Sequence, residues 1–385
     1  MKVLIAVGGG GHFSPALATI DEMPKDWDVL LVGRKYAFEG DKALSLEFQT
    51  AQRLHLSFEA LTTGRLQRKF SKQSLLSLAK IPFGLTQANV ILQRYKPDVV
   101  LSFGGYVAVP VILAAAARRI PIVIHEQTLR AGLANKIASK FATKICLSWN
   151  ESAPYFPENK VVFTGNPLRK EFVKNLATAE DTDLEKDDIA DISNKSPLLY
   201  VTGGSGGAHG INVLIEGSLE TLLEKYTLIH QTGDAKQYGD YDRLEAARSR
   251  LPENLKKRYL LAKFIEAEKV MQILSQADLV IARSGINTVT ELLYLGKPCL
   301  LIPLPYGQHN EQAANAAFVK KTGLAETLDQ VTATPEALVE IVTRMIDHLS
   351  DYTAHGVESR QLIHTDAATL IVKEVQHAKE KRITA

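Results

Sequence analysis

The 385-residue sequence contains only two cysteines, Cys146 and Cys299, each within an apolar run. No cysteine and histidine cluster has zinc-site spacing, so the sequence predicts reduced, buried thiols without a disulfide or metal framework. The longest uncharged apolar run, Val107 to Ala117, is shorter than the ~20 residues of a membrane-spanning helix. The apolar start at Met1 is too short for a signal peptide. We therefore expect a cytoplasmic protein that does not cross a membrane.

The sequence also lacks a charge bias. It has 45 basic and 43 acidic residues, which give a net charge of +2. This balance excludes a global basic field for nucleic acid, so no nucleic-acid partner is expected and any charged partner must meet a local patch. The composition, 45% hydrophobic and 23% charged, is that of a globular protein, and the length predicts two or three domains.

Three ligand-binding motifs are missing as well. The sequence has no G-x-x-x-x-G-K-[ST] phosphate loop. The glycine turn Gly8–Gly11 does not read G-x-G-x-x-G, and the next strand-like run ends in Arg34-Lys35 without the acidic residue of dinucleotide enzymes, which disfavours a dehydrogenase. No D-x-D motif lies in a glycine-rich loop of the first half. We therefore expect no bound metal and no cofactor.

What the sequence does contain is a regular alternation of strand-like apolar runs with segments long enough for a helix. The runs are continuous and β-branched, as in parallel strands buried on both faces. The alternation predicts an α/β protein with two Rossmann-like, doubly wound domains that face a cleft. The first series of runs is KVLIAV, WDVLLVG, PDVVLSFGG, IPIVIHE, TKICLSW and KVVFTG; the second is SPLLYVTGG, YTLIHQTG, RYLLAKFI, ADLVIARSG and KPCLLIPL.

The domain boundaries follow from the two series and from composition. An acidic run from Glu180 to Asp191 separates the series and is typical of a solvated linker. We expect an N-terminal domain over residues 1–165, a hinge and acidic linker over 166–195, a C-terminal domain over 196–360 and a C-terminal helix over 361–385.

Three turns connect a strand to a helix and suit an anion: Gly8–Gly11, Gly203–Gly207 and Ser284-Gly285. Glycine lets the backbone approach a ligand closely, and the helix N-terminus adds N–H groups and a positive dipole end. A single turn of this kind is more often a tight connection than a site. Three of them without a phosphate-loop lysine favour a diphosphate, whose charge would be met by dipoles rather than by a metal.

Polar side chains near these turns are candidates for ligand binding. Thr288 and Glu291 lie three residues apart and share a face near the start of an expected helix over 287–295. Glu291 either favours the helix dipole or accepts hydrogen bonds from ribose hydroxyls. Gln312 opens a later helix, where it either decorates the surface or contacts sugar hydroxyls.

The candidate for proton transfer is His12, which directly follows the first glycine turn. A neutral imidazole is suited to general-base work near neutral pH. A hydrogen bond to a substrate phosphate is the alternative role of His12. Glu126, after the fourth strand-like run, is the rival base, and the neighbouring His125 has a structural role in this interpretation.

A basic and apolar segment precedes the third strand-like run. No acidic residue occurs from Ala60 to Pro97, whereas seven bases do. The part from Arg65 to Phe83 holds five bases beside leucines, isoleucine and phenylalanine. It is either an ordinary amphipathic helix or a patch that binds an anionic membrane surface.

Eight motifs occur in a fixed order: GGGGH with Pro15, FGGYVAVP, HEQTLRAGLANKIA, GNPLR, GGSGGAHGIN, Phe264-Ile265, RSGINTVTE and QHNEQAANA. Together they resemble glycosyltransferase family 28, and within it the bacterial N-acetylglucosaminyltransferases of peptidoglycan synthesis. The resemblance covers residues 1 to about 325 and continues more weakly to the end. It implies a GT-B fold and inverting transfer of N-acetylglucosamine from UDP-N-acetylglucosamine (UDP-GlcNAc) to the muramyl 4-hydroxyl of lipid I, a polyprenyl-diphosphate-linked acceptor. It also implies a peripheral position on the cytoplasmic face of the membrane.

The resemblance also implies residue roles. Ile265 would contact the uracil through its backbone, Glu291 the ribose and Gln312 the sugar. Arg169, in GNPLR, matches a donor-site residue of the family. The other matched substrate-binding positions are Gly9, Gly10, Gly11, Thr128, Ser205, Ile286, Asn287, Thr288, Val289 and Thr290.

The sequence departs from the family's pattern at four positions. Gly9 stands where threonine is usual, and Thr128 where a sugar-binding asparagine is frequent. Gly206 replaces a frequent glutamine, and Glu311 a frequent glutamine or histidine. Three other functions remain open: transfer to another glycolipid acceptor, epimerisation of UDP-GlcNAc, and nucleotide binding without catalysis.

Overall fold

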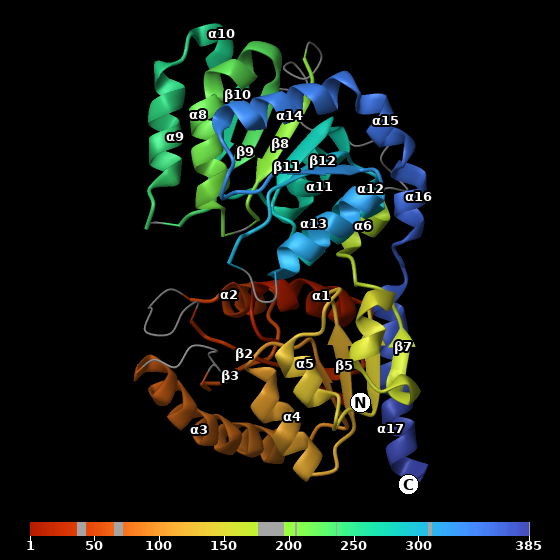
Figure 1. Cartoon of the computed structure of the whole chain (residues 1–385). Helices are drawn as coiled ribbons and strands as arrows, with labels where there is room; N and C mark the ends of the chain where they lie inside the picture. Colours follow the sequence, from red (N-terminus) through yellow and green to blue (C-terminus); the bar gives the residue numbers. More distant parts are fainter. Residues whose placement is uncertain are drawn as a thin grey trace. The chain divides into compact units, whose positions relative to one another are not determined.

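The computed structural model describes residues 1–36, 44–64, 72–175, 196–204, 206–235, 237–306 and 310–384. The chain divides into two compact units. Unit 1 comprises Met1–Lys170 and His364–Ala385, and unit 2 comprises Glu171–Ile363. Each unit is built on its own parallel sheet with helices on the faces (Figure 1). The expectation of two Rossmann-like, doubly wound units is therefore confirmed.

The sheet of unit 1 has seven strands, in the order β3-β2-β1-β4-β5-β6-β7. Every neighbouring pair is parallel. The order reverses between β1 and β4, and in sheets of this kind a ligand binds where the carboxyl ends of the strands diverge. The strands are β1 (Lys2–Ala6), β2 (Asp28–Gly33), β3 (Phe58–Ala60), β4 (Val99–Ser102), β5 (Ile122–Glu126), β6 (Lys144–Leu147) and β7 (Val161–Phe163).

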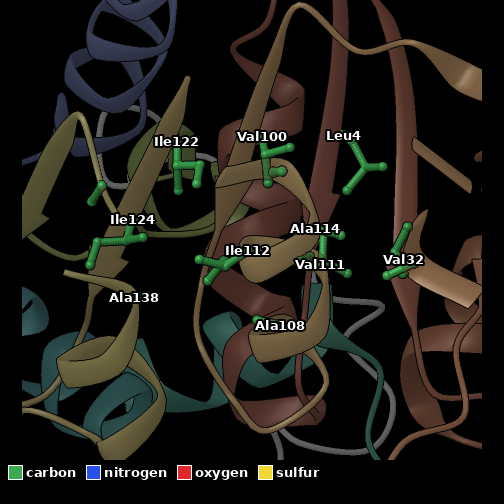
Figure 2. Packing of buried hydrophobic residues seen from close by; sticks show 14 of the residues in the cluster. Leu4, Val32, Val100, Ala108, Val111, Ile112, Ala114, Ile122, Ile124 and Ala138 are labelled. Carbon is green, nitrogen blue, oxygen red and sulfur yellow. The ribbon is translucent and has the colours of Figure 1, made fainter. Parts of the chain in front are cut away.

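Helices cover both faces of this sheet, because alternate residues of each buried strand point to opposite sides. On one face Leu4 packs with apolar residues of the other strands and of α3 (Lys72–Tyr95), α4 (Ala108–Ala117) and α5 (Leu133–Ala138), as Figure 2 shows for α4 and α5. On the other face Val3 and Ile5 pack with α1 (Gly10–Asp21), α2 (Leu46–Arg53) and α17 (Ala367–Thr384). The C-terminal helix thus completes the core of unit 1.

The sheet of unit 2 has six parallel strands, in the order β10-β9-β8-β11-β12-β13, with the same reversal, here between β8 and β11. The strands are β8 (Leu198–Thr202), β9 (Thr227–Gln231), β10 (Tyr259–Ala262), β11 (Leu279–Ala282), β12 (Cys299–Leu301) and β13 (Ala325–Thr327). Helices α8 (His209–Lys225) and α14 (Pro335–Asp347) share one core with Leu199 and Val201 of β8.

The remaining helices complete unit 2 and the connections. They are α9 (Asp240–Arg250), α10 (Glu253–Lys256), α11 (Ala267–Gln276), α12 (Ile286–Leu295), α13 (Glu311–Lys321), α15 (Leu349–Ala354) and α16 (Gly356–Gln361). The short helix α6 (Lys170–Asn175) lies at the boundary between the units, and two 3₁₀ turns, Asn150–Tyr155 and Glu158–Lys160, precede β7. Among the described residues no helix has the length and apolar character that a bilayer span requires.

The glycine turns that follow β1 and β4 pack directly against each other at the switch point of unit 1. A Cβ atom on Gly8 would lie 2.7 Å from the carbonyl oxygen of Gly104 and nearer still to Gly105 Cα. The opposing atoms belong to the backbone and cannot move aside as a flexible side chain would. Glycine at position 8 is therefore a packing requirement.

Gly8→Ala should lower the free energy of unfolding by roughly 1–3 kcal/mol, the range for overpacking a close contact. The matched control is Gly11→Ala, because nothing lies within 4 Å of a Cβ built there. Alanine in α1 should leave stability unchanged or raise it by up to about 1 kcal/mol. Chemical denaturation of both variants measures the difference, and a Gly8→Ala protein as stable as the parent would contradict the close approach.

Candidate functional site

The first glycine turn forms the start of α1. Gly9 precedes the helix with φ of 129°, a region that side-chain-bearing residues rarely adopt, and no side chain caps the helix. A Cβ atom on Gly9 would lie 3.1 Å from the guanidinium Nη2 of Arg34, which follows β2. The turn therefore combines a helix N-terminus with a nearby cation, as an anion site requires.

His12 lies in the first turn of α1 and is half-buried. Its Nδ1 lies 2.9 Å from the side-chain Nε2 of Gln127, which follows β5. Burial, and secondly the guanidinium of Arg34, lower the pKa of His12 to about 4. The imidazole is therefore neutral at physiological pH, the form that a general base or a hydrogen-bond donor to substrate needs.

The rival base, Glu126, is buried at the end of β5 and is already fully hydrogen-bonded. Its Oε1 accepts from the N–H of Thr128 at 3.1 Å and from the hydroxyl of Thr128 at 2.7 Å. Its Oε2 accepts from the N–H of Gly132 at 3.0 Å and from Nδ2 of Asn135 at 3.1 Å. Burial raises the pKa of Glu126, although these four hydrogen bonds act in the opposite direction. The carboxyl thus holds the loop that follows β5.

Thr128 and His125, the neighbours of this carboxyl, are also held by hydrogen bonds within unit 1. Thr128 is buried, and its hydroxyl lies 2.6 Å from the carbonyl oxygen of Arg130 as well as beside Glu126. Its hydroxyl is thus hydrogen-bonded within the loop. His125 is fully buried, and its Nε2 contacts the carbonyl of Gly165 at 3.2 Å and the hydroxyl of Ser148 at 3.0 Å. These contacts agree with a structural role for His125.

The glycine turn of unit 2 is tied to a distant loop by Gln231 at the end of β9. Its Nε2 donates to the carbonyl of Gly204 at 3.0 Å, and its Oε1 accepts from the N–H of Ile265 at 3.0 Å. Gln231 is buried, so both ends of its amide are used inside the protein. The N–H of Ile265 is therefore already bonded to Gln231. To contact a uracil, the backbone of Ile265 would use its carbonyl, or its N–H would have to leave Gln231.

The candidate residues of α12 lie on two faces of the helix, one buried and one half-buried. Ile286, Val289 and Thr290 are buried, and the hydroxyl of Thr290 donates to the carbonyl of Ile286 at 2.8 Å. Asn287, Thr288 and Glu291 are only half-buried. Positions three and four apart share a helix face, so these three side chains are the ones that α12 can offer to a ligand.

Gln312 lies in the first turn of α13, and its amide oxygen accepts from the N–H of Leu304 at 2.9 Å. Its backbone carbonyl accepts from the hydroxyl of Ser284, at 2.7 Å, in the turn before α12. These two hydrogen bonds join the turn after β11 to the start of α13. Gln312 and the half-buried face of α12 therefore belong to one local arrangement.

The other predicted site residues lie at the start of α1, before α6 or outside the described residues. Gly10 and Gly11 are the first two residues of α1. Arg169 is half-buried between β7 and α6. Ser205 lies outside the described residues, as do Arg65 to Ser71 of the basic segment, and the side chains of residues 72–79 are not described either.

Sequence reasoning did not assign roles to four residues that organise these sites: Arg34, Gln127, Asn135 and Gln231. In the sequence only their position indicates such a role. Arg34, Gln127 and Gln231 lie at or just after the end of a strand, where parallel sheets bind ligands. Glutamine and asparagine side chains at such places can also serve as internal hydrogen-bond partners, and only the structure distinguishes the two roles.

Two doubly wound units with glycine turns at their switch points define the GT-B class of nucleotide-sugar enzymes. The N-terminal domain of glycosyltransferase family 28 matches residues 3–147, and the family's C-terminal domain matches residues 198–371. The chain therefore belongs to glycosyltransferase family 28.

Curated relatives match nearly the whole chain. Two of them, from Clostridium botulinum (strain Loch Maree) and Geobacter sulfurreducens, are named "UDP-N-acetylglucosamine--N-acetylmuramyl-(pentapeptide) pyrophosphoryl-undecaprenol N-acetylglucosamine transferase". The first is 32% identical and covers 94% of this chain and 95% of its own. The second is 34% identical and covers 99% of this chain and 100% of its own.

Solved structures agree with the fold. MurG of Acinetobacter baumannii superposes with a TM-score of 0.70 at 26% identity and covers 98% of this chain and 99% of its own. A UDP-GlcNAc 2-epimerase from Neisseria meningitidis superposes with a TM-score of 0.65 at 18% identity, over 97% of this chain and 99% of its own. At that identity the epimerase likeness shows the fold alone.

Glu126→Gln tests whether this carboxyl is structural. An amide would point a donor at groups that already donate, which leaves at least one buried polar group unpaired and should cost roughly 1–3 kcal/mol of unfolding free energy. Exposed Glu158→Gln is the control and should leave stability unchanged. A Glu126→Gln protein of unchanged stability but greatly reduced turnover would instead make Glu126 the base.

Proposed function

We propose that the protein transfers N-acetylglucosamine from UDP-GlcNAc to the muramyl 4-hydroxyl of lipid I, with inversion at C1, to give lipid II in peptidoglycan synthesis. The observation that carries this proposal is the match to curated transferases of that printed activity at 32% and 34% identity, over nearly the full length of both chains. The match to both domains of family 28 supports it independently.

The donor is assigned to unit 2. Its glycine turn at Gly203–Gly207 and the start of α12 would supply backbone N–H groups for a diphosphate. Glu291, which is half-buried on α12, would accept from the ribose hydroxyls. Gln312 would contact the sugar, and the backbone of Ile265 the uracil. Ser205 and Arg169 are assigned to the donor on the family resemblance alone.

The proton of the acceptor hydroxyl is assigned to His12. Its imidazole is neutral and lies in the first turn of α1, beside the Gly9–Gly11 turn and Arg34. That turn would hold the acceptor's anionic diphosphate near the base. Glu126 is the weaker candidate because its two oxygens already accept four hydrogen bonds.

Incubation of the purified protein with radiolabelled UDP-GlcNAc and lipid I tests the activity. The expected product is a lipid-linked disaccharide with a β-linkage, formed as UDP is released. Conversion of UDP-GlcNAc to UDP-N-acetylmannosamine, without transfer to lipid I, would indicate an epimerase instead. Transfer to other glycolipids in preference to lipid I would leave the reaction type standing and contradict the acceptor.

Glu291→Ala should weaken UDP binding by roughly 1.5–3 kcal/mol, because hydrogen bonds from the ribose to a charged group would be lost. Titration calorimetry with UDP measures the affinity. The control is Glu340→Ala, which removes an equal charge from an exposed position on α14. Unchanged UDP affinity in Glu291→Ala would show that this acid, which lies in the middle of α12, does not contact the nucleotide.

The segment from Arg65 to Phe83 is assigned to an anionic membrane surface, which would bring the protein to a lipid-borne acceptor. Phe83 is 60% exposed and Val90 is 54% exposed on α3. Seven residues correspond to two helical turns, so these apolar side chains share one face. The charge of the whole stretch from Ala60 to Pro97 is uniformly positive. Exposed apolar residues beside bases are the pattern of interfacial helices.

Replacing Arg68, Lys69 and Lys72 by serine should reduce binding to anionic liposomes, since each base near such a surface contributes about 1 kcal/mol. Turnover of lipid-borne acceptor should fall with it, whereas turnover of a short-chain soluble acceptor should stay nearly unchanged. The control replaces exposed Lys225, Lys257 and Lys321 of unit 2 by serine. Equal loss on both acceptors would contradict the membrane assignment.

A further inference from the structure

The side chain of Gln127 contacts His12, and the proposed reaction gives this contact no role. Its side-chain Nε2 lies 2.9 Å from His12 Nδ1, although the two residues are 115 positions apart. Gln127 is 4% exposed, so its amide is confined beside the imidazole. A neutral imidazole carries its proton on one ring nitrogen, and the hydrogen-bond partner of one nitrogen selects the tautomer.

We propose that Gln127 is a positioning residue that selects the tautomer of His12, with its amide oxygen facing Nδ1 in the reactive orientation. This inference rests on the proposed transfer reaction. With the oxygen toward Nδ1, the ring carries Nδ1–H and leaves the Nε2 lone pair for the proton of the acceptor. With the nitrogen toward Nδ1, as the amide lies here, the ring proton sits on Nε2 and His12 can only donate there.

The backbone of Gln127 is held firmly, so the change is confined to the amide. The indole Nε1 of Trp149 donates to the carbonyl of Gln127 at 3.1 Å. On one side the carbonyl of Glu126 accepts from the N–H of Ser148 at 3.0 Å, and on the other the N–H of Thr128 donates to the Glu126 side chain at 3.1 Å. A half-turn about the last side-chain bond exchanges two nearly isosteric atoms without moving the loop.

The half-turn does not reduce the number of hydrogen bonds that the amide makes. Gln127 Oε1 is buried and has no hydrogen-bond partner within the part of the chain that the structure describes. Turning it to Nδ1 gives this oxygen a donor and removes one bond from the amide nitrogen. The number of hydrogen bonds made by the amide is therefore the same in both orientations.

The reactive orientation also supports the charge that develops. As the acceptor oxygen bonds to C1, its O–H bond breaks and the proton goes to Nε2. The bond from C1 to the phosphate oxygen breaks at the same time, and its electrons leave with UDP. The resulting imidazolium has an N–H at both nitrogens, and Gln127 Oε1 accepts the one at Nδ1.

Other charged and titratable groups near His12 come from three elements. Arg34, after β2, lowers the pKa of His12 and is itself paired with Glu47 of α2 at 3.0 Å. His125 of β5 is close enough that His12 contributes to lowering the pKa of His125, after the larger effect of burial. The neutral amide of Gln127 would orient His12 without raising the pKa of the imidazole. A carboxylate at position 127 would raise the pKa of His12.

Two variants separate the orientations. Gln127→Glu supplies a carboxylate that can only accept, so it should fix Nδ1–H and keep kcat within about tenfold of the parent. Gln127→Met is similar in size but forms no such hydrogen bond, and should lower kcat roughly 10–100-fold, the range for lost orienting partners. The affinity for UDP should be unchanged in both, and exposed Gln52→Glu is the control.

The tautomer itself is measured by ¹⁵N NMR of the histidine rings, with His12→Asn for assignment and thermal unfolding to confirm that each variant is folded. We expect the Nδ1–H form of His12 in Gln127→Glu and a shift away from it in Gln127→Met. One common tautomer in all proteins, or equal loss of kcat in both variants, would overturn the proposal. The spectra need no substrate, so tautomer control in a parent protein that fails to act on lipid I would refute only the proposed function.

Discussion

The carboxyl of Glu126 lies buried at the end of β5 and needs several hydrogen-bond donors at once. Thr128, Gly132 and Asn135 supply them, and they can do so only while the loop after β5 keeps one conformation. A buried carboxylate without such donors would cost several kcal/mol, so the loop is strongly constrained. That loop also carries Gln127, whose amide contacts His12, so the place of this contact depends on the hydrogen bonds of Glu126.

In unit 2 a neutral amide, rather than a carboxyl group, holds loops at the ends of the strands. Gln231 at the end of β9 joins the turn after β8 to the loop after β10 through the two ends of one amide. Each unit thus uses a side chain at the end of a strand to fix loops that the sheet alone would leave independent. In both cases the ordered loops are those at the carboxyl ends of the strands, where doubly wound sheets bind their ligands.

The sequence predicted eleven strands and the glycine turns, because continuous apolar runs and turn residues are local signals. It missed β3 and β13, each a three-residue edge strand without a continuous β-branched run. It placed Glu126 near the end of a strand but gave no sign of its four donors, which depend on how a loop folds back. The contact of His12 with Gln127 was likewise invisible, because it depends on which strands become neighbours.

If His12 removes the proton and unit 2 binds the donor, substitution of His12 should affect turnover without affecting donor binding. The direct measurement is kcat for transfer to lipid I together with the dissociation constant for UDP, in the parent and in His12→Ala. General-base help is typically worth 10²–10⁴-fold, so kcat should fall by about that factor while UDP affinity changes little. Near-native kcat, or a loss of UDP affinity that matches the loss of turnover, would contradict the account.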